Sequence, residues 1–250
     1  MKWCLMSTSV FQSVCDEIVG NGWEKNGIGT IGEKTLHAVL KHYYAPTDAL
    51  HEVKIGSFVA DIISDNCVIE IQTRAFNRLR RKLEVFLESF QVMVVYPIPQ
   101  TKWLLWIDES TGETSRKRKS PKQGSIHDAI AELYRVKSFL RHPNFKLCIA
   151  LIDMEEYRYL NGWSADRKKG STRYDRVPID LISEVFFDTV HDYLHFIPES
   201  LADGFTSKEY SKETRTTLRV SQTALNVLHY LGVVKRVGKR GRSFIYERTG

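Results

Sequence analysis

The chain has 250 residues, of which 42% are hydrophobic and 26% charged. That is the composition of an ordinary globular protein and excludes a fibrous or disordered one. Its formal net charge of +6 permits a polyanionic partner without requiring one. No run of residues approaches the roughly 18 apolar residues of a membrane span, so no membrane partner is expected.

The N-terminal stretch MKWCLMSTSVFQSVC has no sustained apolar core, which argues against a signal peptide. The four cysteines are Cys4, Cys15, Cys67 and Cys148. They form no C-x-x-C unit, which argues against a thiolate zinc site or a redox motif. We therefore expect reduced thiols and a cytoplasmic location.

Two helices are expected before the first strand. Apolar residues recur at helical spacing over Ser7–Val19 and over Thr30–Tyr44. Glu33 lies one turn before Leu36, so its side chain is expected to point inward. An acidic residue in the first turn also stabilises the helix dipole, and both interpretations of Glu33 stay open. The first strand is expected over His51–Ile55.

The stretch Ser57–Arg74 predicts two strands joined by a tight polar turn at Asp65 and Asn66. With that turn, the expected pairs are Ser64 with Cys67, Ile63 with Val68, Ile62 with Ile69, and Asp61 with Glu70. Side chains alternate between the two faces of a strand. Asp61 and Glu70 therefore share one face of the hairpin.

These two carboxylates repel each other across the hairpin. Apolar neighbours on the same face indicate that the pair is half buried, and buried like charges require a compensating cation or a raised pKa. A divalent metal held by oxygen ligands meets that requirement. The alternative is a solvent-facing hairpin whose acidic side chains point at water.

Further elements follow the hairpin. They are a helix over Asn77–Glu88, strands over Val92–Tyr96 and Leu104–Ile107, a helix over Ser125–Leu140 and a strand over Leu147–Ile152. Pro97 and Pro99 are expected to end the strand before them, since proline cannot donate to a strand ladder.

An acidic residue on a helix, then Asp, then Glu-x-Lys on the next strand is the pattern of the PD-(D/E)XK nuclease superfamily. The segment from about Gly29 to Asp108 resembles that pattern. Its third part here reads Glu70-Ile71-Gln72, with Gln in the place of Lys, a variant that is similar to some restriction enzymes. The resemblance implies an α/β protein with a restriction-endonuclease-like αβββαβ core.

The resemblance also implies roles for four residues. Glu33, Asp61 and Glu70 would hold Mg²⁺ or Mn²⁺, and Asp61, Glu70 and Gln72 would be the catalytic residues. In the superfamily, the lysine helps to orient and deprotonate the attacking water. Gln72 is neutral and can only hydrogen-bond a water or a ligand, so this departure puts the activity in question.

Two loops concentrate positive charge. The polar loop Ser110–Gly124 carries Arg116, Lys117, Arg118, Lys119 and Lys122, and the loop Ala165–Arg176 carries Arg167, Lys168, Lys169, Arg173 and Arg176. Two such loops beside a metal site are expected to contact the phosphate backbone of DNA. Each loop can equally be a solvated face without a partner.

The C-terminal part has a different pattern. An amphipathic helix is expected over Asp180–Phe196, a second helix capped by Thr206, and a third opened by Thr217 or Ser221 and closed by Gly232. His191 and His195 lie four residues apart on the first, a spacing that can bind a metal, but no third ligand is near in sequence.

Two strands, VVKRV and SFIYER, follow around a basic turn. Three helices and a basic two-stranded wing resemble a winged helix-turn-helix domain over about Asp180–Gly250. Such a domain places its last helix in the major groove and its wing along the DNA backbone. The wing residues expected to bind DNA are Lys235, Arg236, Lys239, Arg240 and Arg242. A winged helix used for protein contacts is the alternative.

The expected organisation is therefore a nuclease-like domain over residues 1–179 and a winged helix-turn-helix domain over residues 180–250. The expected function is Mg²⁺-dependent hydrolysis of phosphodiester bonds in double-stranded DNA, compatible with a homodimer. The first alternative is a catalytically inactive nuclease-like fold that acts as a DNA-binding or regulatory protein. A second alternative is RNA as the substrate.

Overall fold

A computed structural model describes residues 8–26, 35–64, 66–161 and 172–249. The α-helices are α1 (Thr8–Asn26), α2 (Thr35–Tyr44), α3 (Arg80–Phe86), α4 (Ile130–Arg135), α5 (Ser207–Thr214) and α6 (Leu218–Leu231). Short 3₁₀ helices are η1 (Asp48–Leu50), η2 (Phe76–Leu79), η3 (Ile126–Ala129), η4 (Lys137–Phe139) and η5 (Val190–Phe196). In this described part, no helix has both the length and the apolar character needed to cross a membrane.

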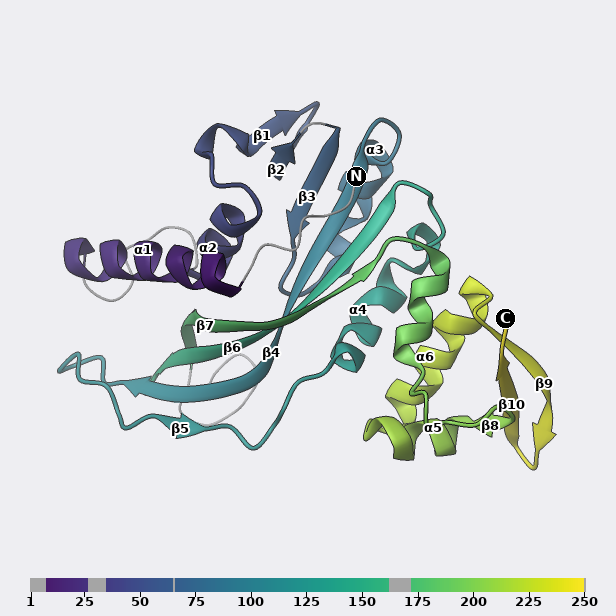
Figure 1. Cartoon of the computed structure of the whole chain (residues 1–250). Coiled ribbons are helices and arrows are strands. Elements are labelled where there is room, and N and C mark those ends of the chain that lie inside the picture. Colours follow the sequence, from purple (N-terminus) through teal and green to yellow (C-terminus); the bar gives the residue numbers. More distant parts are fainter. Residues whose placement is uncertain (1–7, 27–34, 65, 162–171, 250) are drawn as a thin grey trace. The chain divides into compact units, whose positions relative to one another are not determined.

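The protein is of the α/β class and is built on one large mixed sheet (Figure 1). Its strands are β1 (His51–Ile55), β2 (Phe58–Ser64), β3 (Cys67–Ile71), β4 (Gln91–Ile107), β5 (Arg118–Lys119), β6 (Phe145–Tyr159) and β7 (Thr172–Phe187). They lie in the order β1-β2-β3-β4-β6-β7, and β5 pairs with β4. A smaller sheet joins β8 (Phe205–Thr206), β10 (Ser243–Arg248) and β9 (Val234–Arg240) in that order.

The predicted order of helix, three strands, helix and strand is confirmed by α2, β1, β2, β3, α3 and β4. Strands β2 and β3 are antiparallel, whereas β3 and β4 are parallel. Parallel neighbours need a crossover connection, which η2 and α3 supply. Leu83 and Phe86 of α3 are fully buried, so the crossover helix contributes to the core.

The expected end of the strand at Pro97 and Pro99 is wrong. Strand β4 runs unbroken from Gln91 to Ile107 and includes both prolines. The pairing of β3 with β4 reaches only to Ile71 opposite Val95. Pro97 and Pro99 lie beyond that point, where β3 no longer pairs with β4. A proline is tolerated there because it removes no hydrogen bond to β3.

The expected helix over Asp180–Phe196 is also wrong. Strand β7 continues to Phe187, and η5 takes up the rest. The apolar residues suit either structure, but Ile179, Ile182 and Val185 are β-branched and favour a strand. His191 and His195 accordingly lie on a 3₁₀ helix, and the ring of His195 packs edge-on against Phe187.

The caps and strands predicted near the C-terminus are confirmed. Thr206 caps α5 in a reciprocal capping box with Glu209, and Thr217 caps α6. Gly232 ends α6 with φ of 83°, a left-handed conformation that favours glycine. Figure 1 shows β9 and β10 as a twisted hairpin.

The chain forms two compact units that alternate along the sequence. One unit contains residues 1–51, 99–125 and 150–184, and the other contains residues 52–98, 126–149 and 185–250. In the second unit, α6 packs against α4 as well as α5. The predicted division into residues 1–179 and 180–250 stays a prediction.

Candidate active site and nucleic-acid interface

The hairpin of β2 and β3 has the predicted register. Ile62 pairs with Ile69, Ile63 with Val68, and Ser64 with Cys67. Next to the Ile62–Ile69 pair, the Oδ2 atom of Asp61 accepts a hydrogen bond of 2.8 Å from the backbone N–H of Ile71, the last residue of β3. Asp61 on β2 is thereby held beside the end of β3, next to Glu70.

Glu70 is buried, with a side chain only 2% exposed. The Nζ atom of Lys82 lies 3.0 Å from its Oε1 and 2.8 Å from its Oε2. Burial, together with the neighbouring charge of Asp61, raises the pKa of Glu70 to about 7, although Lys82 acts in the opposite direction. Both compensations expected for this pair of carboxylates, a cation and a raised pKa, are present.

Lys82 was not singled out from the sequence, although a signal for it was available. Leu79 is three residues before it and Phe86 four residues after it, and both are buried. Helix positions separated by three or four residues share a face. This spacing places Lys82 on the same face of the helix as these buried residues, where its Nζ atom meets the carboxylate of Glu70.

Gln72 does not join this group. Its side-chain N–H donates to the backbone carbonyl of Arg74, and its backbone N–H donates to the carbonyl of Val95 at 2.9 Å. The structure thus brings together Asp61, Glu70 and Lys82 and directs the amide of Gln72 elsewhere. Glu33, the third predicted metal ligand, lies outside the described residues.

The first basic loop is exposed, and its cations Lys117 and Lys119 contact residues of the neighbouring strands. Lys117 lies 2.6 Å from Oε1 of Glu155 and 4.8 Å from the centroid of the Trp103 ring. Lys119 approaches the same ring at 6.0 Å. Arg118 and Lys119 form β5, which pairs with β4. The middle of the predicted loop therefore packs against Trp103 of β4.

Only part of the second basic loop is described, because Arg167, Lys168 and Lys169 lie outside the described residues. Arg173 is exposed on β7. Arg176 instead turns to Glu156, with its Nε atom 3.0 Å from Oε2.

Glu156 is a buried carboxylate surrounded by three half-buried cations, a group that sequence reasoning missed. Lys102 lies 3.2 Å from its Oε2, and Arg158 and Arg176 bind the same carboxylate. Burial alone would raise the pKa of Glu156, but Arg176, Lys102 and Arg158 together lower it to about 2. Alternation along β6 predicts which residues face inward, but not which cations from other strands meet there.

The wing carries the predicted cations on an exposed hairpin, and several make local contacts. Arg240 binds Oε1 of Glu209 at 2.8 Å, and Lys235 lies 3.5 Å from Glu247. The guanidinium of Arg236 lies 4.2 Å from the centroid of the Phe244 ring, and Lys239 lies 5.2 Å from it. Arg242 is exposed in the turn.

Comparison with known proteins places this α/β architecture in a family. Residues 34–188 match the model of a family described as a domain of unknown function, DUF8091. The chain belongs to that family. The matched segment contains Asp61, Glu70 and Lys82 and ends at residue 188, so it includes only the first few residues of the region expected to form the winged helix.

A relative from Treponema pallidum (strain Nichols), named as an uncharacterized protein, is 29% identical over 228 residues. The match covers 88% of this chain and 87% of that protein. No solved structure matches the chain.

Proposed function

We propose that the protein is a metal-dependent DNA endonuclease of the PD-(D/E)XK type, acting in the cytoplasm. The observation that carries this proposal is the buried carboxylate of Glu70, which has the carboxylate of Asp61 and the cation of Lys82 beside it. The order of α2, β1, β2, β3, α3 and β4, with β3 parallel to β4, supports a restriction-endonuclease-like core.

The donor set fits Mg²⁺ or Mn²⁺, which prefer carboxylate oxygens. Asp61 and Glu70 would hold the ion, and Glu33 is the third proposed ligand. Bound there, such an ion would polarise the scissile phosphate and lower the pKa of a bound water. Lys82 is the proposed source of the positive charge that the superfamily places at the position of Gln72.

The test is cleavage of supercoiled plasmid in Mg²⁺ and in Mn²⁺, with EDTA as the blank. We expect Asp61→Asn and Glu70→Gln each to abolish cleavage, because each removes an anionic ligand. The matched control is Glu84→Gln, which removes the same charge from an exposed position of α3 and should cleave as the parent does. A parent without activity, or variants that cleave like the parent, would refute the assignment.

Lys82 has its own matched pair of variants. Lys82→Gln should reduce cleavage at least tenfold, whereas Arg81→Gln, at the exposed neighbouring position, should leave it unchanged. Equal activity of both variants would remove Lys82 from the proposed site. Circular dichroism of each variant checks that the fold is retained.

The second candidate is a catalytically inactive nuclease-like fold that acts as a DNA-binding or regulatory protein. It is favoured by Gln72 in the place of lysine and by Lys82, which neutralises Glu70 without a metal. Binding of Mn²⁺, measured by electron paramagnetic resonance, separates the two. An inactive protein need not bind Mn²⁺ through Asp61 and Glu70, so parent and Glu70→Gln would then behave alike.

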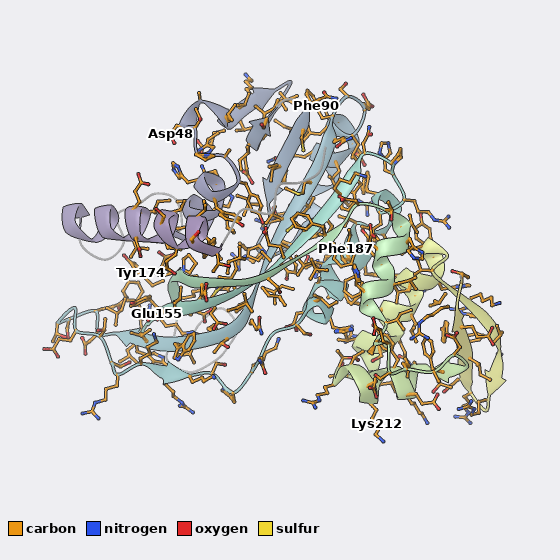
Figure 2. The ribbon with its side chains drawn as sticks, viewed as in Figure 1. Asp48, Phe90, Glu155, Tyr174, Phe187 and Lys212 are labelled. Carbon is orange, nitrogen blue, oxygen red and sulfur yellow. The ribbon has the colours of Figure 1, made fainter. Side chains whose placement is uncertain are left out.

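Binding of double-stranded DNA is part of the same proposal, and the wing is its sharpest test. Lys239→Gln with Arg242→Gln removes two exposed cations and should lower the slope of log K on log salt by about 1.8, at ~0.9 per phosphate contact. The control is Lys208→Gln with Lys212→Gln, which removes two exposed charges from α5 (Lys212 is labelled in Figure 2). Equal slopes for the two double variants would show that these wing residues do not contact the DNA backbone.

A further inference from the structure

A second group of metal-binding side chains lies where the chain passes from α2 to β1. His42 comes from α2, Asp48 from η1 and His51 from the start of β1. One ligand atom from each lies within 4.8 Å of the other two. Among the described residues this is the one group of three or more His, Cys, Asp or Glu side chains arranged in this way. Figure 2 labels Asp48 in this segment.

The local fold explains how residues nine apart in sequence meet. Just after the end of α2, the N–H of Ala45 still donates to the carbonyl of Lys41 at 2.8 Å. The next turn closes when the N–H of Leu50 donates to the carbonyl of Thr47 at 3.0 Å. This turn brings the ring of His51 against that of His42, edge to face, with 4.9 Å between their centroids.

The hydrogen bond of His51 sets its tautomer. Its Nε2 atom lies 2.7 Å from the backbone carbonyl of Ala45, and a carbonyl can only accept, so Nε2 carries the proton. In the neutral ring Nδ1 then holds a lone pair, which faces Oδ1 of Asp48 at 3.6 Å. A histidine that donates one ring N–H to a backbone carbonyl and offers the other nitrogen is the usual arrangement of a metal ligand.

His42 completes the group, with its Nε2 atom also 3.6 Å from Oδ1 of Asp48. Two ring nitrogens therefore converge on one carboxylate oxygen. With metal–ligand bonds of about 2.0–2.1 Å, tetrahedral ligands lie about 3.3–3.4 Å apart. The two distances to Asp48 exceed that by only a few tenths of an ångström.

We propose that His42, Asp48 and His51 bind a divalent transition-metal ion of the Zn²⁺ class. Two nitrogens and one oxygen suit Zn²⁺, whereas Mg²⁺ prefers oxygen ligands alone. The side chain of Asp48 is 84% exposed and that of His42 36%, so the ion keeps a position open to solvent. This site goes beyond the proposed endonuclease function and shares no residue with Asp61 and Glu70.

The ion would join the end of α2 to the start of β1. Because it binds the folded chain through three residues that the fold brings together, it stabilises the folded state by mass action. Asp48 and His42 are exposed enough to be replaced without disturbing the core. Variants at these two positions therefore test the site without the risk of unfolding the protein.

The experiment is titration of the full chain, first stripped with EDTA, with ZnCl₂ by calorimetry and with CoCl₂ by visible absorption. We expect one high-affinity equivalent and the d–d bands of a low-symmetry site. Asp48→Asn and His42→Ala should each weaken Zn²⁺ binding at least tenfold. His191→Ala, which removes an exposed histidine elsewhere, and Glu70→Gln should bind as the parent does.

The proposal is overturned if the parent binds no Zn²⁺, or if Asp48→Asn and His42→Ala bind it as tightly as the parent. Loss of Zn²⁺ binding in Glu70→Gln would also overturn it, because the ion would then sit at the other carboxylates. Plasmid cleavage in Mg²⁺ is scored separately, so failure of this site is distinguishable from failure of the proposed endonuclease activity.

Discussion

Glu70 on β3 and Glu156 on β6 are equally buried, each only 1% exposed, yet their surroundings drive them in opposite directions. Glu70 has one cation, Lys82, and a second carboxylate, Asp61, beside it, and its pKa rises to about 7. Glu156 has three cations around it, and its pKa falls to about 2. Burial raises the pKa of both carboxyls, and the charges around each one decide whether that rise remains, as in Glu70, or is reversed, as in Glu156.

The largest expected loss of stability comes from removing the carboxylate of Glu156, which has three cations around it. Glu156→Gln leaves Lys102, Arg158 and Arg176 half buried without their common anion, which should cost about 3 kcal/mol of unfolding free energy. Urea unfolding of parent and variant measures it. The control is Glu155→Gln at the next position, whose pair with the more exposed Lys117 should contribute less than about 1 kcal/mol. If the two variants lost equal unfolding free energy, the three cations around Glu156 would contribute no more than the single exposed Lys117 beside Glu155.

The dependence on pH should differ in sign between the two glutamates. The folded pKa of Glu70 is raised from its ordinary 4.5 to about 7, so the folded protein holds a proton that the unfolded chain has lost between those values. Stability should therefore fall as pH rises through this window, by on the order of 3 kcal/mol. Glu156 contributes stability that is present above pH 4.5 and is lost as pH falls toward 2.

Unfolding free energies of the parent, Glu70→Gln and Glu156→Gln from pH 3 to pH 8 test both signs. The difference between the parent and Glu70→Gln should change between about pH 4.5 and pH 7. The difference between the parent and Glu156→Gln should change only below about pH 4.5. A constant difference for Glu70→Gln would show that its carboxyl titrates normally.

The smallest effect is expected at an exposed ion pair whose charged atoms have the same separation. Arg240 lies 2.8 Å from Glu209, the separation found between Lys82 and Glu70, but its side chain is 60% exposed. Water and salt screen such a pair. Arg240→Ala should therefore lower the unfolding free energy by less than about 1 kcal/mol, and a loss as large as that of Glu156→Gln would contradict the role given to burial.

Local signals predicted the fold where they were strong. The pairing of β2 with β3 follows the register predicted from the polar residues after Ser64, and the caps at Thr206, Thr217 and Gly232 set the ends of α5 and α6. Prediction failed where tertiary pairing overrides local pattern. The prolines of β4 lie past the end of β3, and β7 extends through a segment whose apolar spacing also suits a helix.

The candidate site was predictable in part for the same reason. Asp61 and Glu70 follow from a hairpin, which is a contact between near neighbours in sequence. Arg158 lies two residues from Glu156 on β6, but Lys102 lies on β4 and Arg176 on β7. Their contact with Glu156 depends on the sheet order, which no local pattern specifies. His42 and His51 lie close in sequence, but their convergence depends on the irregular turn between them.

The buried thiol of Cys67 lies three residues before Glu70 on β3, and its alkylation measures local opening of this region. Burial raises its pKa to about 12, so almost no thiolate exists at neutral pH and alkylating reagents must wait until the hairpin opens. The rate of modification at Cys67 then reports how often β3 separates from its neighbours. Cys15, whose pKa is also raised to about 12, lies on α1 and gives an internal reference for opening elsewhere. An ion held by Asp61 and Glu70 would lower the rate of alkylation at Cys67 and leave the rate at Cys15 unchanged.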